Sequence, residues 1–149
     1  MRTEVVARLR VTFGVDSPLS YVSVLDFGRL WERLLRRANV PIAYSQGFNP
    51  QARLQFAAAL PVGYSSDCEL VDLYLAEELA PEVFLALMRP QCPPGLSLIA
   101  AEVVPVKGPT PQAKMRAAEY DVALWTETGP EAVGAAIADV LGRETILRL

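Results

Sequence analysis

The sequence predicts an α+β fold in which strands and helices share one hydrophobic core. Stretches in which apolar and polar residues alternate, as in strands, interleave with stretches in which apolar residues recur every three or four positions, as in helices. The 149 residues suit one domain, and a composition with 52% hydrophobic and 21% charged residues allows a buried core. These proportions exclude a disordered chain.

The first predicted elements are a strand at residues 5–13 and a helix at residues 24–38. In the strand, odd-numbered residues are apolar, whereas Arg8 and Arg10 stand on the other side. Ser23 precedes the helix at the spacing of a capping box. One face of this helix is apolar and should pack on a sheet: Phe27, Leu30, Trp31, Leu34, Leu35 and Ala38.

Four further elements follow a loop at residues 39–51. Alternating residues predict strands at 53–60 and 69–75, joined as a hairpin by a wide turn. Pro81 suits the first turn of a helix that ends at Met88. Another strand follows at residues 96–104.

The order strand, helix, strand, strand, helix, strand is that of the ferredoxin-like βαββαβ sandwich, which we assign to residues 1–104. Residues 105–116 are rich in proline and predict a linker. Residues 117–149 predict a second, partial αβ unit. It consists of a strand at 117–126, a helix at 130–141 and the start of a strand at 144–149.

Charge is unevenly distributed along the chain, whose net charge is −3. Residues 1–53 contain eight arginines and four acidic residues, whereas the remainder contains six basic and thirteen acidic residues. This segregation indicates a surface on one side of the molecule that binds a polyanion.

Arginines recur on one face of the helix predicted at residues 24–38. Arg29, Arg33 and Arg37 are spaced by four residues, with Arg36 beside them and Glu32 placed to pair with Arg36. Guanidinium groups one turn apart can bind successive phosphates or a run of carboxylates. The same pattern also fits an ordinary solvated helix face.

The loop after this helix is the second candidate site. It combines aromatic, amide and hydroxyl side chains around a glycine: Tyr44, Ser45, Gln46, Gly47, Phe48 and Asn49. Such side chains can stack on an unpaired base and hydrogen-bond to it, with Arg53 contacting phosphate. Alternatively, the two aromatic residues pin the loop to the core.

Residues for catalysis or metal binding are scarce. The chain has no histidine, which excludes the triads that depend on one, and Cys68 and Cys92 alone cannot form a zinc site; both are more typical of buried apolar residues. Asp67, Glu69 and Asp72 match no metal-binding loop and favour a solvated strand edge. We therefore expect no cofactor, no metal and no complete catalytic site.

Features of membrane or exported proteins are also missing from the sequence. No apolar stretch approaches the roughly 20 residues that span a bilayer. The first residues lack the apolar region of a signal peptide. We expect a cytoplasmic protein without a membrane partner.

Residues 25–72 resemble the radical-SAM-linked protein family, a bacterial domain of unknown function encoded beside, or fused to, a radical SAM protein with a cobalamin-binding region. The resemblance rests on Leu25-Asp26, Arg29, Glu32-Arg33, Arg36-Arg37-Ala38, Pro41, Ala43-Tyr44-Ser45, Gly47-Phe48-Asn49-Pro50, Arg53, Phe56, Leu60-Pro61, Gly63, Ser66, Glu69 and Asp72. Val24, Gln46 and Gln51 stand where histidines are common in the family. Hydrogen bonding through the two glutamines remains available, whereas metal or acid–base chemistry does not.

The resemblance implies an accessory role to a radical SAM enzyme, with RNA as the substrate. We therefore predict a non-catalytic module that binds RNA, or docks the radical SAM partner, to present that enzyme's substrate. One alternative is an RNA-modifying or RNA-cleaving enzyme that uses Tyr44, Ser45, Glu69 and Asp72. Another is a protein-binding scaffold whose arginines meet an acidic partner.

Overall fold

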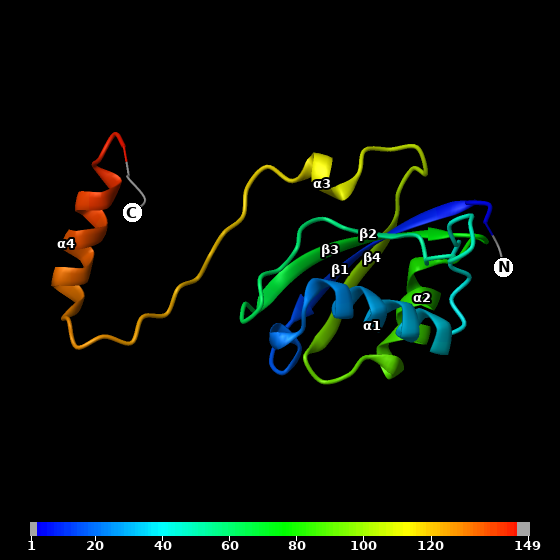
Figure 1. The fold of residues 1–149 in the computed structure, drawn as a ribbon, viewed down its shortest axis with the longest axis horizontal. Coiled ribbons are helices and arrows are strands. Elements are labelled where there is room, and N and C mark those ends of the chain that lie inside the picture. The colour runs from blue at the N-terminus through cyan, green and yellow to red at the C-terminus, as the bar shows by residue number, and fades with distance from the viewer. Residues whose placement is uncertain (1–2, 146–149) are drawn as a thin grey trace. The chain divides into compact units, whose positions relative to one another are not determined.

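The computed structural model describes residues 3–145 and divides the chain into two compact units, Met1–Arg116 and Ala117–Leu149 (Figure 1). The first unit contains the sheet and the core. The predicted α+β class is confirmed by its sheet and by the helices packed against it.

The sheet of the first unit has four strands in the order β2-β3-β1-β4, and each neighbouring pair is antiparallel. The strands are β1 (Ala7–Val15), β2 (Leu54–Phe56), β3 (Ser66–Leu75) and β4 (Leu96–Val103). The predicted strand at residues 53–60 is thus only three residues long, because its ladder with β3 runs only from Leu54 to Phe56.

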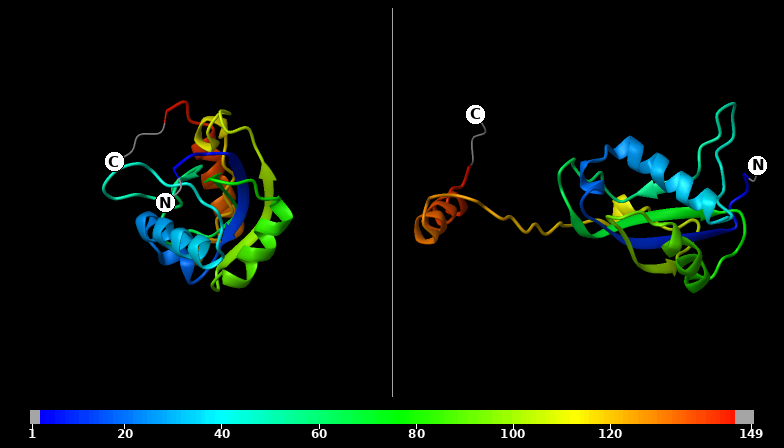
Figure 2. Two further views of the ribbon diagram at one scale, coloured as in Figure 1. Left: turned by 90° about the vertical axis from the view of Figure 1, so that its right-hand side faces the viewer. Right: turned by 90° about the horizontal axis from the view of Figure 1, so that it is seen from below.

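Helices α1 (Val24–Arg37) and α2 (Pro81–Met88) cover one face of the sheet (Figure 2). Short 3₁₀ turns, η1 (Leu19–Tyr21) and η2 (Arg89–Gln91), precede α1 and follow α2. The predicted positions of both helices are confirmed. Ser23 caps α1, since its side chain accepts from the Asp26 backbone N–H at 3.2 Å and donates to the Asp26 carboxylate at 2.8 Å.

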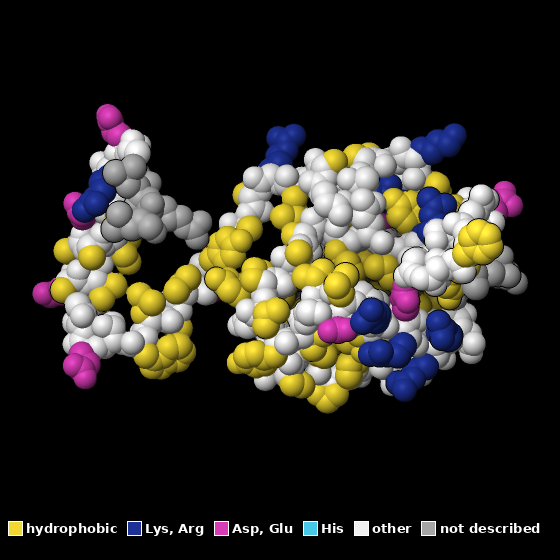
Figure 3. Space-filling view, in the orientation of Figure 1, with side chains coloured by type: hydrophobic (Ala, Val, Ile, Leu, Met, Phe, Trp, Pro, Cys, Tyr) yellow, Lys and Arg dark blue, Asp and Glu magenta, His cyan; other side chains and the backbone are white. Residues whose placement is uncertain are grey.

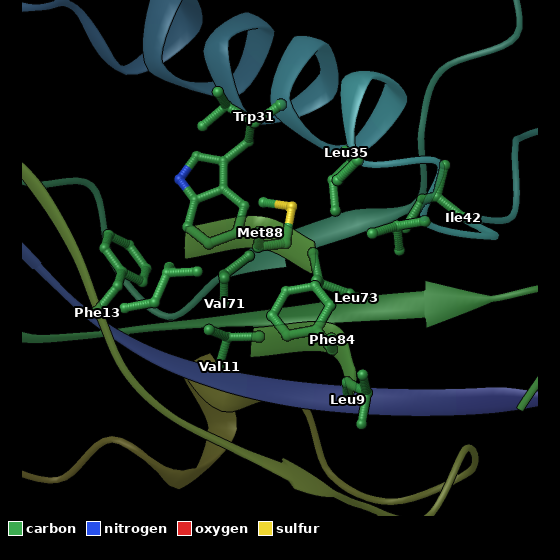
Figure 4. Close-up of a cluster of buried hydrophobic side chains, with 14 of the residues drawn as sticks. Leu9, Val11, Phe13, Trp31, Leu35, Ile42, Val71, Leu73, Phe84 and Met88 are labelled. Carbon is green, nitrogen blue, oxygen red and sulfur yellow. The ribbon is translucent and has the colours of Figure 1, made fainter. Parts of the chain in front are cut away.

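The core lies between these helices and the sheet (Figure 4). The odd-numbered side chains of residues 9–15 in β1 and 71–75 in β3 enter it, and the register places Leu9 opposite Leu73 and Val11 opposite Val71. Trp31 of α1 is fully buried and packs edge-on against Phe13, with 5.1 Å between ring centroids. Because side chains alternate along a strand, the even-numbered residues point to the opposite face, on which no helix of comparable length lies among the described residues of the first unit.

Residues 105–114, here called the strap, cross this second face. The Val104 N–H donates to the Arg8 carbonyl at 3.0 Å where the strap begins. The strap ends in α3 (Pro111–Lys114), which contacts β2 and β3, and the Gln112 amide there donates to the Phe56 carbonyl. The segment predicted as a linker is therefore packed on the first unit.

The second unit contains α4 (Pro130–Leu141), as predicted, and none of the residues of α4 is buried. The strand predicted at residues 117–126 is wrong, because the segment has no ladder partner among residues 3–145. Most of the strand predicted at 144–149 lies outside the described residues. Within the described range, no helix has the length and apolarity to cross a bilayer.

Candidate nucleic-acid interface

The four arginines of α1 lie on its solvent-facing side, opposite the buried Trp31. Helical geometry places Arg29 to Arg37 within an arc of about 100° and over about 12 Å of helix axis. Figure 3 shows basic side chains gathered over α1. This exposure suits the arginines for binding a chain of anions.

Most of these arginines have no acidic partner in the described part of the chain. Arg29 pairs with Asp26 at 3.2 Å between two exposed side chains, which one helical turn brings together. The predicted pair between Glu32 and Arg36 is not formed there. The pKa of Asp26 is lowered, first by the hydrogen bond from Ser23 and then by Arg29. Within residues 3–145, Arg33, Arg36 and Arg37 are in no ion pair.

Residues 43–53 form an irregular hairpin directly after α1. Tyr44 and Ala52 bridge its two arms, and the Ser45 N–H donates to the Gln51 carbonyl at 2.9 Å. The Ser45 hydroxyl accepts from the Gln51 N–H at 3.0 Å. Tyr44 is half-buried and packs against the core. Tyr44 and Ser45 therefore hold the base of the hairpin.

The tip of this hairpin projects from the unit (Figure 2). It carries four exposed residues: Gln46, Gly47, Phe48 and Asn49. Phe48 is fully exposed, and Gly47 has a φ of 131°, which side chains rarely tolerate. The two aromatic residues of the loop therefore differ in role. Tyr44 anchors the loop to the core, whereas Phe48 is free to stack on a base.

Arg53 does not join the α1 row. Its guanidinium lies 5.3 Å from the centroid of the Tyr74 ring, and Tyr74 points away from the helices because the buried Leu73 and Leu75 point toward them. The Arg8 guanidinium lies 5.4 Å from the same centroid. Arg53 therefore belongs to the strap side of the sheet.

A buried ionic cluster of Arg8, Arg10 and Asp72 lies on that side, and sequence reasoning missed it. Arg8 is 1% exposed, Arg10 7% and Asp72 0%. The Asp72 carboxylate accepts from Arg8 Nε at 2.8 Å and from Arg10 Nε and Nη2 at 2.8 and 2.9 Å. The pKa of Arg10 is raised, and its hydrogen bond to Asp72 is the largest cause. The available signal was a pair of arginines at alternate positions of a strand that is otherwise mostly apolar.

Arg8 also binds the strap. Its Nη1 donates to the carbonyls of Pro105 and Gly108 at 3.2 and 2.9 Å, and its Nη2 donates to that of Pro109 at 2.8 Å. Together with the bonds that Nε and Nη2 donate to Asp72, these contacts use all the N–H donors of one guanidinium. The cluster is therefore a structural tie between sheet and strap, and Asp72 is not the solvated carboxylate that the sequence predicted.

The residues proposed for an RNA-modifying enzyme are not brought together. Asp72 is enclosed on the strap side, Glu69 points to the helix side of the same strand, and Tyr44 and Ser45 lie in the hairpin. Within residues 3–145, no three acidic or cysteine side chains are grouped to hold a metal ion.

The two cysteines are both free but differ in exposure. Cys68 is exposed, contrary to expectation, because it lies on the face of β3 opposite the core, and Cys92 is half-buried. Burial raises the pKa of the Cys92 thiol.

Comparison with known families gives a match over nearly the whole chain. The family described as "Uncharacterized protein conserved in bacteria (DUF2344)" matches residues 8–148. No curated protein matches the sequence.

Proposed function

The chain belongs to the DUF2344 family of bacterial proteins, and we propose that it is a non-catalytic accessory module that holds RNA. In this proposal the arginines of α1 contact phosphates, and the hairpin tip stacks on an unpaired base. The observation that carries the proposal is the row of exposed arginines that ends beside a hairpin with a fully exposed phenylalanine.

The pairing of charge with an exposed aromatic ring favours single-stranded RNA. Proteins that bind single strands combine a basic surface along the backbone with aromatic rings on which bases stack. Arg33, Arg36 and Arg37 offer unpaired guanidinium groups within the described part of the chain, and Phe48 offers both faces of its ring. The amides of Gln46 and Asn49 supply donors and acceptors for the edge of a base.

The partner follows from the resemblance to the radical-SAM-linked family. On that basis, we propose that the RNA is the substrate of a radical SAM enzyme to which this module presents it. The strand order and antiparallel pairing support a ferredoxin-like assignment of the first unit. Sheets of this kind serve as RNA-binding scaffolds in other proteins.

RNA retention by the purified protein tests this proposal. We expect Arg33→Glu, Arg36→Glu and Arg37→Glu together to abolish binding of a labelled single-stranded RNA, and Phe48→Ala to weaken it. A matched control reverses three other exposed charges, with Lys107→Glu, Lys114→Glu and Arg116→Glu. The measurement is fluorescence anisotropy over a salt series, with circular dichroism to check folding.

The salt dependence gives the decisive comparison. Each phosphate contact with a single strand contributes about 0.7 to the slope of log K against log salt, so three contacts contribute about 2. Equal binding by the α1 variant and the wild type would overturn the proposal. Equal loss in both triple variants would mean that only net charge matters and would also count against it. RNA turnover by the purified protein would favour the enzymatic alternative.

A further inference from the structure

An apolar hollow lies at the end of the first unit where α1 begins. The arginines of the last turn of α1 lie at the other end of that helix. Its cavity volume is about 30 Å³, and residues of β1, η1, α1 and the segment after β2 line it. Phe13, Phe27 and Phe56 form its wall, with 5.7 to 6.2 Å between ring centroids. Among the described residues, only Ser20 and Glu69 contribute polar side chains to the lining.

Exposed apolar side chains surround this hollow. Five large ones lie on η1, on the first turn of α1 and on the turn that precedes β3: Tyr21, Val24, Leu25, Val62 and Tyr64. The Gly63 N–H donates to the Ser20 carbonyl at 2.6 Å, which holds that turn against η1. Contiguous exposed apolar surface around a depression is typical of a site that binds another protein.

The charge of this region is acidic. The sequence has no lysine or arginine between Arg10 and Arg29 or between Arg53 and Arg89, and every lining residue comes from these two stretches. Glu69 lies opposite Phe13 and lines the hollow, and Asp67, two residues earlier in β3, is exposed. Within the described residues, neither is in an ion pair. An apolar site whose described lining includes a carboxylate and no basic residue attracts a cationic ligand.

We propose that this acidic-apolar hollow docks a segment of a partner protein that presents an apolar side chain flanked by lysines or arginines. The apolar side chain fills the hollow against the phenylalanines, and its basic neighbours meet Asp67 and Glu69. RNA does not fit, because the carboxylates repel phosphate. None of the residues that line the hollow belongs to the proposed RNA surface. One molecule can therefore hold RNA and the partner protein together.

A second copy of the chain is the weaker occupant. The hairpin tip of a second copy would offer an apolar side chain, Phe48, near arginines. A contact between that tip and the hollow of the next molecule would, however, join two different surfaces. Such a head-to-tail contact closes only as a ring and otherwise grows into a filament. We therefore assign the hollow to a different protein.

Binding of designed peptides to the full chain tests the proposal. The probe is a fluorescein-labelled twelve-residue peptide with two leucines flanked by lysines. Its comparison peptides replace the lysines by glutamates or the leucines by serines. We expect only the first peptide to bind, and Asp67→Lys with Glu69→Lys to weaken it about tenfold. Leu25→Ser with Tyr64→Ser should weaken binding of this peptide as well. Both residues are exposed, so the fold should tolerate the two changes.

The control variant, Glu78→Lys with Glu82→Lys, reverses two exposed charges outside the hollow and should leave peptide affinity unchanged. The proposal would be overturned if this control lost as much peptide affinity as the Asp67 and Glu69 variant. It would also be overturned if the serine peptide bound as tightly as the leucine peptide. Sedimentation showing self-association that the Asp67 and Glu69 changes abolish would overturn it as well. Single-stranded RNA affinity should persist in all these variants, which separates this site from the proposed RNA surface.

Discussion

At the scale of single residues, the least replaceable group is the Asp72 carboxylate. It is fully buried and neutralises part of the charge of two buried guanidinium groups. Asp72→Asn keeps the shape of the side chain and removes its charge. We expect a loss of about 3 to 5 kcal/mol of unfolding free energy, as when one partner of a buried ion pair is removed.

Urea unfolding followed by circular dichroism measures this loss. Asp67→Asn is the matched control on the same strand, and because Asp67 is exposed its cost should stay within about 0.5 kcal/mol. Equal unfolding midpoints for the two variants would show that the cluster contributes nothing to stability.

The two cysteines should differ in reactivity for a physical reason. The thiolate is the reactive form, and burial raises the pKa of Cys92, so less of its thiolate is present at neutral pH. A thiol reagent at pH 7 should therefore label the exposed Cys68 quickly and Cys92 slowly. The slow phase should accelerate as the pH rises toward the raised pKa of Cys92, and it should vanish in Cys92→Ser. If both thiols were labelled in a single fast phase, this expectation would be contradicted.

At the scale of elements, the start of α1 depends on the pair of Ser23 and Asp26. The hydrogen bond from Ser23 and the contact with Arg29 lower the pKa of Asp26 from 3.8. A carboxylate with a lowered folded pKa stabilises the folded state above its unfolded pKa. That contribution is lost as the pH falls through the lower folded value.

Ser23→Ala removes both the cap and the largest cause of this pKa shift. We expect it to cost about 1 kcal/mol at neutral pH, a typical value for a lost N-cap. We also expect stability to fall less than in the wild type as the pH drops below 3.8. Thermal unfolding at several pH values measures both effects, and NMR titration of Asp26 should show its pKa rising. Identical pH profiles for variant and wild type would refute the prediction.

At the scale of the whole molecule, one side chain ties the strap to the sheet. Arg8 binds three strap carbonyls while Asp72 holds its guanidinium. Arg8→Lys keeps the charge but cannot make this set of bonds, because an ammonium group lacks the planar fork. We expect the strap to loosen in this variant.

Limited digestion with trypsin measures the loosening, since Lys107 lies within the strap. Cleavage after Lys107 should be several-fold faster in Arg8→Lys than in the wild type. Arg29→Lys, on the exposed face of α1, should not change the rate. An unchanged rate in Arg8→Lys would show that other contacts hold the strap.

The sequence by itself determined the α+β class, the order of elements through residue 104 and the positions of α1, α2 and α4. These features depend on local periodicity and capping, which neighbouring residues encode. It also predicted the exposed arginines of α1, because the apolar face of the helix defines the opposite one. The function proposed for those arginines stays a prediction.

Only the tertiary structure decided which polar residues are buried and where the remaining segments lie. Arg8 and Asp72 are 64 positions apart, and strand pairing alone makes them partners. The strap contains prolines typical of a linker, yet long-range bonds from Arg8 fix it to the sheet. Residues 117–126 alternate like a strand but have no ladder partner among the described residues, and a strand exists only through such pairing. Periodicity predicts a residue's face, whereas burial and pairing depend on what the rest of the chain brings against it.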